Sequence, residues 1–145
     1  KLSVDSRGAL FNSATWDRER NNHQVTALAS AARVATTTSA SLTNYNAKGI
    51  MIGVDVTAVG APAGQISTVE VLSLVGTTEV IIYSFANVAL AAVGTRHNLV
   101  YPAAASAGGW STAPAQGVIP RTFRIRVTHD NANSITYSVT VDFIN

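Results

Sequence analysis

Alternation of apolar and polar residues constrains the fold of this chain more than any other feature. In residues 50–57 the even positions are all β-branched and apolar, whereas Met, Gly, Asp and Thr occupy the odd ones. Residues 123–128 and 135–143 alternate in the same way. A period of two places successive side chains on opposite faces of a strand. The three segments are therefore predicted to be β-strands with one buried face.

A hairpin is predicted in the middle of the chain. Residues 69–75 and 79–85 are rich in Val, Leu and Ile, and residues 76–78 (Gly-Thr-Thr) separate them as a turn. The apolar positions of the first segment change phase after Val71. Such a change indicates a β-bulge or burial on both faces.

The remaining predicted elements are turns and weak strands, so the predicted fold contains only β-structure. The turn formers of residues 129–134 predict a second hairpin between the last two alternating segments, and residues 60–64 are predicted to form a short loop. Weaker strands are predicted at residues 33–38, 88–93 and 97–101. About seven or eight short strands with no convincing helix indicate a single Ig-like or jelly-roll-type antiparallel β-sandwich. We assign it to residues 33–145.

Residues 1–32 differ in composition from the rest of the chain. Four of the ten basic residues lie here, and the apolar positions form no continuous helical stripe. We expect an extended or partly helical N-terminal arm that orders on a neighbouring subunit, and a flexible tail is the alternative. The candidate contact residues of the arm are Leu10, Phe11, Trp16, Arg18 and Arg20.

Charge is scarce for a folded chain. Only 12% of the 145 residues are Asp, Glu, Lys or Arg, against about 25% in typical globular proteins. Free surface needs charge for solubility, so uncharged stretches indicate a surface partly covered by another protein. The net charge of +2 is spread along the chain, which argues against a nucleic-acid partner. Since no apolar run reaches the ~18 residues of a membrane span, we expect no membrane partner.

The longest uncharged connection contains one large side chain. Residues 102–120 carry no charge, and Trp110 lies between two glycines and a serine. Loops longer than ~12–15 residues are often functional, and tryptophan is enriched among residues that dominate binding energy. We expect Trp110 to contact a partner, and the alternative is a loop folded back over its own core.

The sequence predicts no catalytic machinery. His129 is followed by Asp130, but adjacent residues of a strand point to opposite faces, so the acid would not orient the ring for a Ser-His-Asp triad. The other two histidines are His23, in the arm, and His97, near the start of a predicted strand. Acids that could act as a pair in glycoside hydrolysis fall on outward or turn positions of different strands: Asp55, Glu70, Glu79, Asp130 and Asp142. We expect that the protein is not an enzyme.

One turn offers oxygen ligands to a cation. Asp130, Asn131 and Asn133 could bind Ca²⁺ from one loop. Their spacing lacks the glycine and the downstream glutamate of a known calcium loop, so an Asx-type turn is the favoured interpretation. With no cysteine and no Gly-rich phosphate loop after a strand, we expect no metal and no cofactor.

The densest positive feature is a short strand with three arginines. Arg124 and Arg126 lie on the same outer face, and Arg121 comes just before them. Cross-strand pairing with acids such as Asp142, Glu70 or Glu79 is the favoured interpretation. A docking stripe for an acidic partner is the alternative, so Arg124 and Arg126 are included among the candidate interface residues.

Five short segments of the sequence are similar to a known protein family. They are residues 43–49 (Thr-Asn-Tyr-Asn-Ala-Lys-Gly), 54–59 (Val-Asp-Val-Thr-Ala-Val), 100–102 (Val-Tyr-Pro), 119–129 (Ile-Pro-Arg-Thr-Phe-Arg-Ile-Arg-Val-Thr-His) and 134–139 (Ser-Ile-Thr-Tyr-Ser-Val). In this order they resemble a group of small proteins encoded among the head and structural genes of tailed bacteriophages. The likeness covers about residues 31–144. The turn at residues 76–78 is shorter than in that family, and residues 1–30 have no counterpart there.

The resemblance implies a non-enzymatic virion protein of the capsid surface. It would be a capsid decoration (cement) protein that binds the outside of the head shell and stabilises contacts between major capsid subunits, or a minor head protein. Its partners would be the major capsid protein and further copies of itself, with a trimer as the form that shell construction suggests. The alternatives are an Ig-like carbohydrate- or cell-surface-binding module that uses Trp110 and Tyr101, and a neck or tail-completion protein.

Overall fold

The computed structural model describes residues 9–11, 16–18, 22–45, 47–102 and 117–144 of the chain. Every regular element in these residues is a strand. The strands are β1 (Ala9–Phe11), β2 (Trp16–Arg18), β3 (His23–Arg33), β4 (Thr37–Thr38), β5 (Leu42–Thr43), β6 (Gly49–Val59), β7 (Ile66–Val75), β8 (Thr78–Leu90), β9 (Gly94–Val100), β10 (Thr122–His129) and β11 (Ile135–Ile144).

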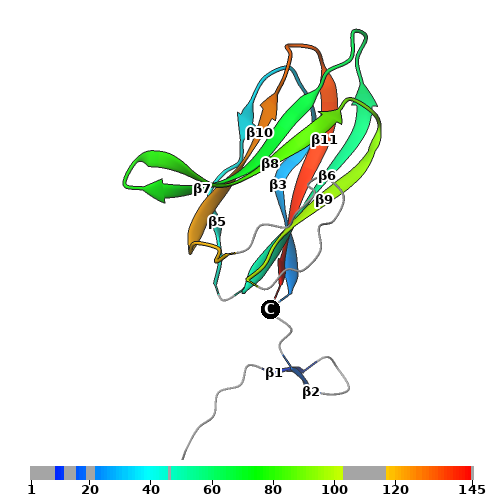
Figure 1. The fold of residues 1–145 in the computed structure, drawn as a ribbon. Coiled ribbons are helices and arrows are strands. Elements are labelled where there is room, and N and C mark those ends of the chain that lie inside the picture. Colours follow the sequence, from blue (N-terminus) through cyan, green and yellow to red (C-terminus); the bar gives the residue numbers. More distant parts are fainter. Residues whose placement is uncertain (1–8, 12–15, 19–21, 46, 103–116, 145) are drawn as a thin grey trace, which may run out of the picture.

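The last nine strands form two antiparallel sheets. The four-stranded sheet has the order β3-β11-β6-β9, and the five-stranded sheet has the order β4-β10-β7-β8 with β5 also paired to β10. Figure 1 shows them as two layers face to face. The prediction of an all-β sandwich is therefore confirmed, while β1 and β2 form a separate two-stranded sheet.

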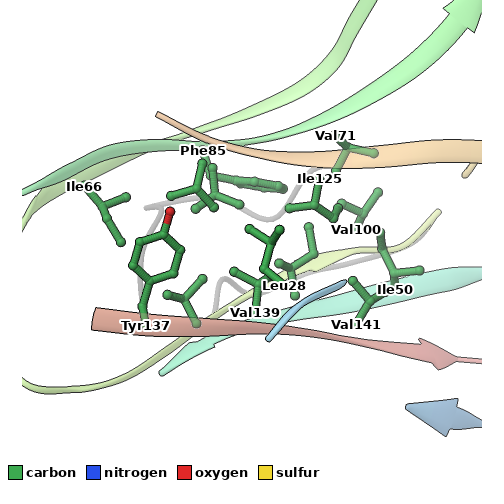
Figure 2. Close-up of a cluster of buried hydrophobic side chains, with 14 of the residues drawn as sticks. Leu28, Ile50, Ile66, Val71, Phe85, Val100, Ile125, Tyr137, Val139 and Val141 are labelled. Atoms are coloured by element: carbon green, nitrogen blue, oxygen red, sulfur yellow. The ribbon is translucent and has the colours of Figure 1, made fainter. Parts of the chain in front are cut away.

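The core lies between the two sheets and follows the alternation in the sequence. On β11 every second residue from Ile135 to Phe143 is buried, and β6 and β10 show the same pattern. Figure 2 shows side chains of both layers meeting, with Tyr137 among the aliphatic groups. Burial of these apolar faces is the main favourable contribution to the stability of the fold.

The sandwich begins earlier than the sequence predicts. Residues 23–32 were assigned to the arm, whereas the structure pairs β3 with β11 from His23↔Phe143 to Arg33↔Ile135. Two register shifts, between Tyr137/Val139 and Val139/Thr140, each add one residue to β3. These bulges break the period of two, which is why the sequence does not show a strand there.

The connection after β10 is not a hairpin loop, contrary to the prediction. β10 pairs with β4, β5 and β7, whereas β11 pairs with β3 and β6 in the other sheet. Residues 130–134 therefore cross from one sheet to the other. The turn residues indicate correctly that the chain reverses direction, but they do not specify which sheet receives the next strand.

The predicted hairpin in the middle of the chain is confirmed. β7 and β8 pair antiparallel from Ile66↔Leu90 to Val75↔Thr78, with a register shift between Val71 and Leu72. Of the two alternatives predicted from the phase change, burial on both faces is confirmed, because residues 69–72 are all buried. The extra residue of the register shift is Ile82 on β8, so the bulge does not lie on the first strand. The separate strand predicted at residues 88–93 is wrong, since β8 continues to Leu90. The strand predicted at residues 33–38 is divided between the end of β3 and β4.

The loop between β6 and β7 packs against the sheet crossing. The peptide bond Ala61-Pro62 is cis, and the Gly60 amide donates to the Ser134 carbonyl over 2.8 Å. A Cβ on Gly64 would lie 2.5 Å from the Ser134 carbonyl oxygen and 2.6 Å from that of Asn133. Only glycine allows this close approach of the two loops.

Candidate protein interface

The end of the β7–β8 hairpin extends beyond the sheet that carries it. Pairing between β10 and β7 ends at Phe123↔Ser73, whereas pairing between β7 and β8 continues to Val75↔Thr78. The pairs Leu74↔Glu79 and Val75↔Thr78 therefore lie beyond β10, whereas Val80 and Ile81 are the first residues of β8 opposite the part of β7 that β10 still pairs with. We call residues 74–81, the end of this hairpin, the ribbon. Figure 1 shows the ribbon projecting from the side of the sandwich.

The ribbon exposes apolar side chains on both faces. Val75 is 66% exposed, Val80 41% and Ile81 48%. The register pairs Ser73 with Val80 and Val75 with Thr78, so Val75 and Val80 share one face, while Ile81 pairs with Leu72 on the other. An isolated two-stranded hairpin is marginally stable in water, and exposed apolar clusters mark interaction sites.

The turn of the ribbon depends on one glycine. The register leaves Gly76 and Thr77 as a two-residue loop between Val75 and Thr78. Gly76 has φ 64°, and a Cβ there would meet no atom within 4 Å. Two-residue hairpin loops require positive φ and therefore favour glycine.

Two ion pairs cross the outer face of the five-stranded sheet. Arg126 Nε lies 2.6 Å from Glu70 Oε2, and Arg124 Nη1 lies 2.9 Å from Glu79 Oε1. Arg124 Nε also donates to the Ser41 hydroxyl over 3.1 Å. The favoured prediction of cross-strand pairing with Glu70 and Glu79 is confirmed. The second pair joins the ribbon to β10, because Glu79 lies on β8 beside the turn.

The structure does not test the other predicted interface residues. Arg20 and Trp110 lie outside the described residues. Phe11, Trp16 and Arg18 lie on the described backbone of β1 and β2, but their side chains lie outside the description. Sequence reasoning missed the ribbon as a surface. The available signal was the run of apolar residues on both sides of the turn at residues 76–78.

A polar cluster joins the two sheets near the end of β10. His129 Nε2 and the Tyr137 hydroxyl are 3.1 Å apart, and they come from β10 and β11. The Arg33 guanidinium lies 4.5 Å from the centre of the Tyr137 ring and donates to the Tyr137 carbonyl over 2.6 Å. It also donates to the carbonyls of Ala29 and Ala31, so it satisfies backbone groups where β3 is bulged.

Burial shifts the pKa values of His129 and Tyr137. Desolvation lowers the pKa of His129, and the nearby charge of Arg33 lowers it further. Burial raises the pKa of Tyr137, against smaller opposing effects of Arg33 and of a hydrogen bond with Thr37. The His129 ring is held by Tyr137, so this histidine belongs to the packing between the sheets.

Several carboxylates and amides that were considered as catalytic or calcium-binding groups form hydrogen bonds within the fold. Asp55 accepts from Thr95 and Asp142 accepts from Gln24, each over 2.8 Å. Asn131 Oδ1 accepts from the Asn133 amide over 3.0 Å, which confirms the predicted Asx-type turn. Within the described residues no group of three or more His, Cys, Asp or Glu is placed to hold a metal. In that same part of the chain no helix could span a membrane.

Comparisons with protein-family models, with curated proteins and with solved structures give no match for this chain.

Proposed function

We propose that this chain is a non-enzymatic structural protein of a tailed bacteriophage, a capsid decoration protein on the outside of the head. It binds the major capsid protein and stabilises contacts between neighbouring subunits, with copies of itself around a local symmetry axis. The observation that carries the proposal is the ribbon, which presents exposed apolar residues away from the sandwich. The sequence resemblance to phage head proteins supplies the class of partner.

The strand order supports a jelly roll rather than an Ig-like sandwich. We count the interrupted β4 and β5 as one strand, so that eight strands run from β3 to β11. The sheets then have the orders 1-8-3-6 and 2-7-4-5, in which the first and last strands are neighbours. Ig-like domains place strands A, B, E and D in one sheet, whereas here the first two strands of the count, β3 and β4–β5, lie in different sheets. Jelly rolls occur in viral capsid and lectin domains, so this support is an analogy of fold.

The physical role of a decoration protein fits a small rigid domain. A protein that binds the assembled shell more tightly than free subunits stabilises the shell by mass action. A sandwich that is already ordered loses little conformational freedom on binding. Each copy adds a modest contact, and repetition over the shell multiplies its effect.

Particle stability tests the proposal. Heads prepared without this protein are expected to release DNA at a lower temperature or under a milder osmotic shock, and addition of the purified protein should restore their resistance. Heads that do not bind the protein, or whose resistance it leaves unchanged, would contradict the proposal.

A further inference from the structure

We infer that the ribbon, residues 74–81, inserts into an uncharged apolar cleft of the shell protein, which covers both of its faces. This inference rests on the proposed function and specifies how the domain binds. Its starting point is the exposure of Val75, Val80 and Ile81, which lie on the two faces of one ribbon. A flat partner surface would cover only one of these faces, whereas a cleft covers both.

The free edge of the ribbon strengthens the inference. In the described residues β8 pairs only with β7, so its other edge presents unpaired backbone groups at residues 78–81. Natural edge strands are usually protected by Lys, Pro or inward-pointing charges. The ribbon contains no Lys or Pro, so a cleft wall that offers extended backbone can pair with this edge.

The charge of the ribbon defines the chemistry of the cleft. Glu79 is the only charged residue among residues 74–81, and Arg124 neutralises it within the domain. The partner therefore needs apolar side chains and no compensating charge. Binding through such a contact depends weakly on ionic strength, since screening acts on charges.

A second copy of the chain is a poorer occupant. Two ribbons placed face to face would cover one face of each and leave the other face exposed. An apolar cleft in another protein surrounds the ribbon and removes more of its surface from water.

Val75→Asp tests the inference, with Val93→Asp as the matched control. Both valines are 66% exposed, and Val93 lies beyond the opposite end of β8, so neither change removes a core side chain. The assay measures the affinity of each variant for heads that lack this protein, at low and high salt. Val75→Asp is expected to weaken binding at least about tenfold, because it places a charge where the cleft would remove an apolar side chain from water. Val93→Asp should bind like the wild type.

Each outcome has a distinct meaning. Equal binding by the two variants overturns the ribbon as the contact and leaves the decoration role in place. Failure of the wild type to bind heads overturns the proposed function and the inference together. A fall in wild-type affinity of tenfold or more between low and high salt contradicts an uncharged contact. A double variant, Val80→Ser with Ile81→Ser, provides a second test that introduces no charge and is expected to lose at least as much affinity.

Discussion

Tyr137 is fully buried and carries a polar hydroxyl, so its environment must supply a hydrogen-bond partner. His129 supplies this partner from the facing sheet, and Arg33 of β3 lies over the Tyr137 ring. The guanidinium also binds carbonyls at the bulges of β3. Three residues from three different strands thus fix how the two sheets meet at this end of the sandwich.

Tyr137→Phe measures the hydrogen bond between the sheets. The variant keeps the ring but leaves both nitrogens of His129 without a partner, because His129 Nδ1 is already buried without one. We expect the free energy of unfolding in urea to fall by about 1–3 kcal/mol. Tyr101→Phe, at a half-exposed position, is the control and should change it little. Equal effects of the two changes would contradict the assigned role of the hydroxyl.

The lowered pKa of His129 predicts a dependence of stability on pH. The unfolded state protonates this histidine near its ordinary pKa of 6.5, whereas the folded state does so only at lower pH. The unfolded state therefore binds more protons between these two values, and the free energy of unfolding falls as pH falls through 6.5 toward the folded pKa. Urea titrations across this window measure the loss. His129→Gln should flatten the dependence, and an unchanged dependence in this variant would contradict the assignment.

At the scale of elements, the two ion pairs differ in burial. The side chains of Arg126 and Glu70 are 27% and 10% exposed, against 35% and 30% for Arg124 and Glu79. Interaction between charges is stronger where water is excluded. The more buried pair should therefore contribute more to the stability of the five-stranded sheet.

Double-mutant cycles compare the two pairs. Arg126→Met with Glu70→Gln should give a coupling energy of more than about 1 kcal/mol, and Arg124→Met with Glu79→Gln a value of about 0.2–1 kcal/mol. Thermal unfolding at low salt supplies the stabilities. A larger coupling for Arg124 and Glu79 would show that burial does not determine the strength of these pairs.

Two glycines support different kinds of loop. Gly76→Ala meets open space but keeps a positive φ, so it should cost about 1–2 kcal/mol. Gly64→Ala places a Cβ against the backbone of Asn133 and Ser134, which cannot rotate away. The loss of unfolding free energy should be larger for Gly64→Ala. A smaller loss would show that the two loops separate easily.

The elements also show how far the sequence determines this fold. The strands of residues 50–57, 123–128 and 135–143 were predictable because one face of each is buried and the other is not. The strand β3 was not predictable, because its bulges break the period of two and most of its residues are small and exposed. The crossing after β10 depends on which sheet receives β11, and local turn chemistry carries no information about that choice.

The candidate interface was predictable only in part. The hairpin and the pairing of Arg124 and Arg126 follow from residue types and spacing. The projection of the ribbon does not, because it depends on where β10 stops pairing with β7, and that is decided by the tertiary arrangement.

At the scale of the whole molecule, fold, charge and ribbon favour one kind of function. A rigid sandwich with 12% charged residues and an apolar ribbon is suited to a repeated contact with other protein subunits. Symmetric shells repeat each contact at many equivalent positions. A decoration protein must therefore be present in many copies.

Counting this chain in intact heads by quantitative mass spectrometry tests the decoration role. A decoration protein should be present on the order of hundreds of copies per head, because each equivalent position of the shell binds one. A ring at the neck would hold about a dozen copies. Hundreds of copies are the result that we predict, and a dozen or none would contradict the decoration role.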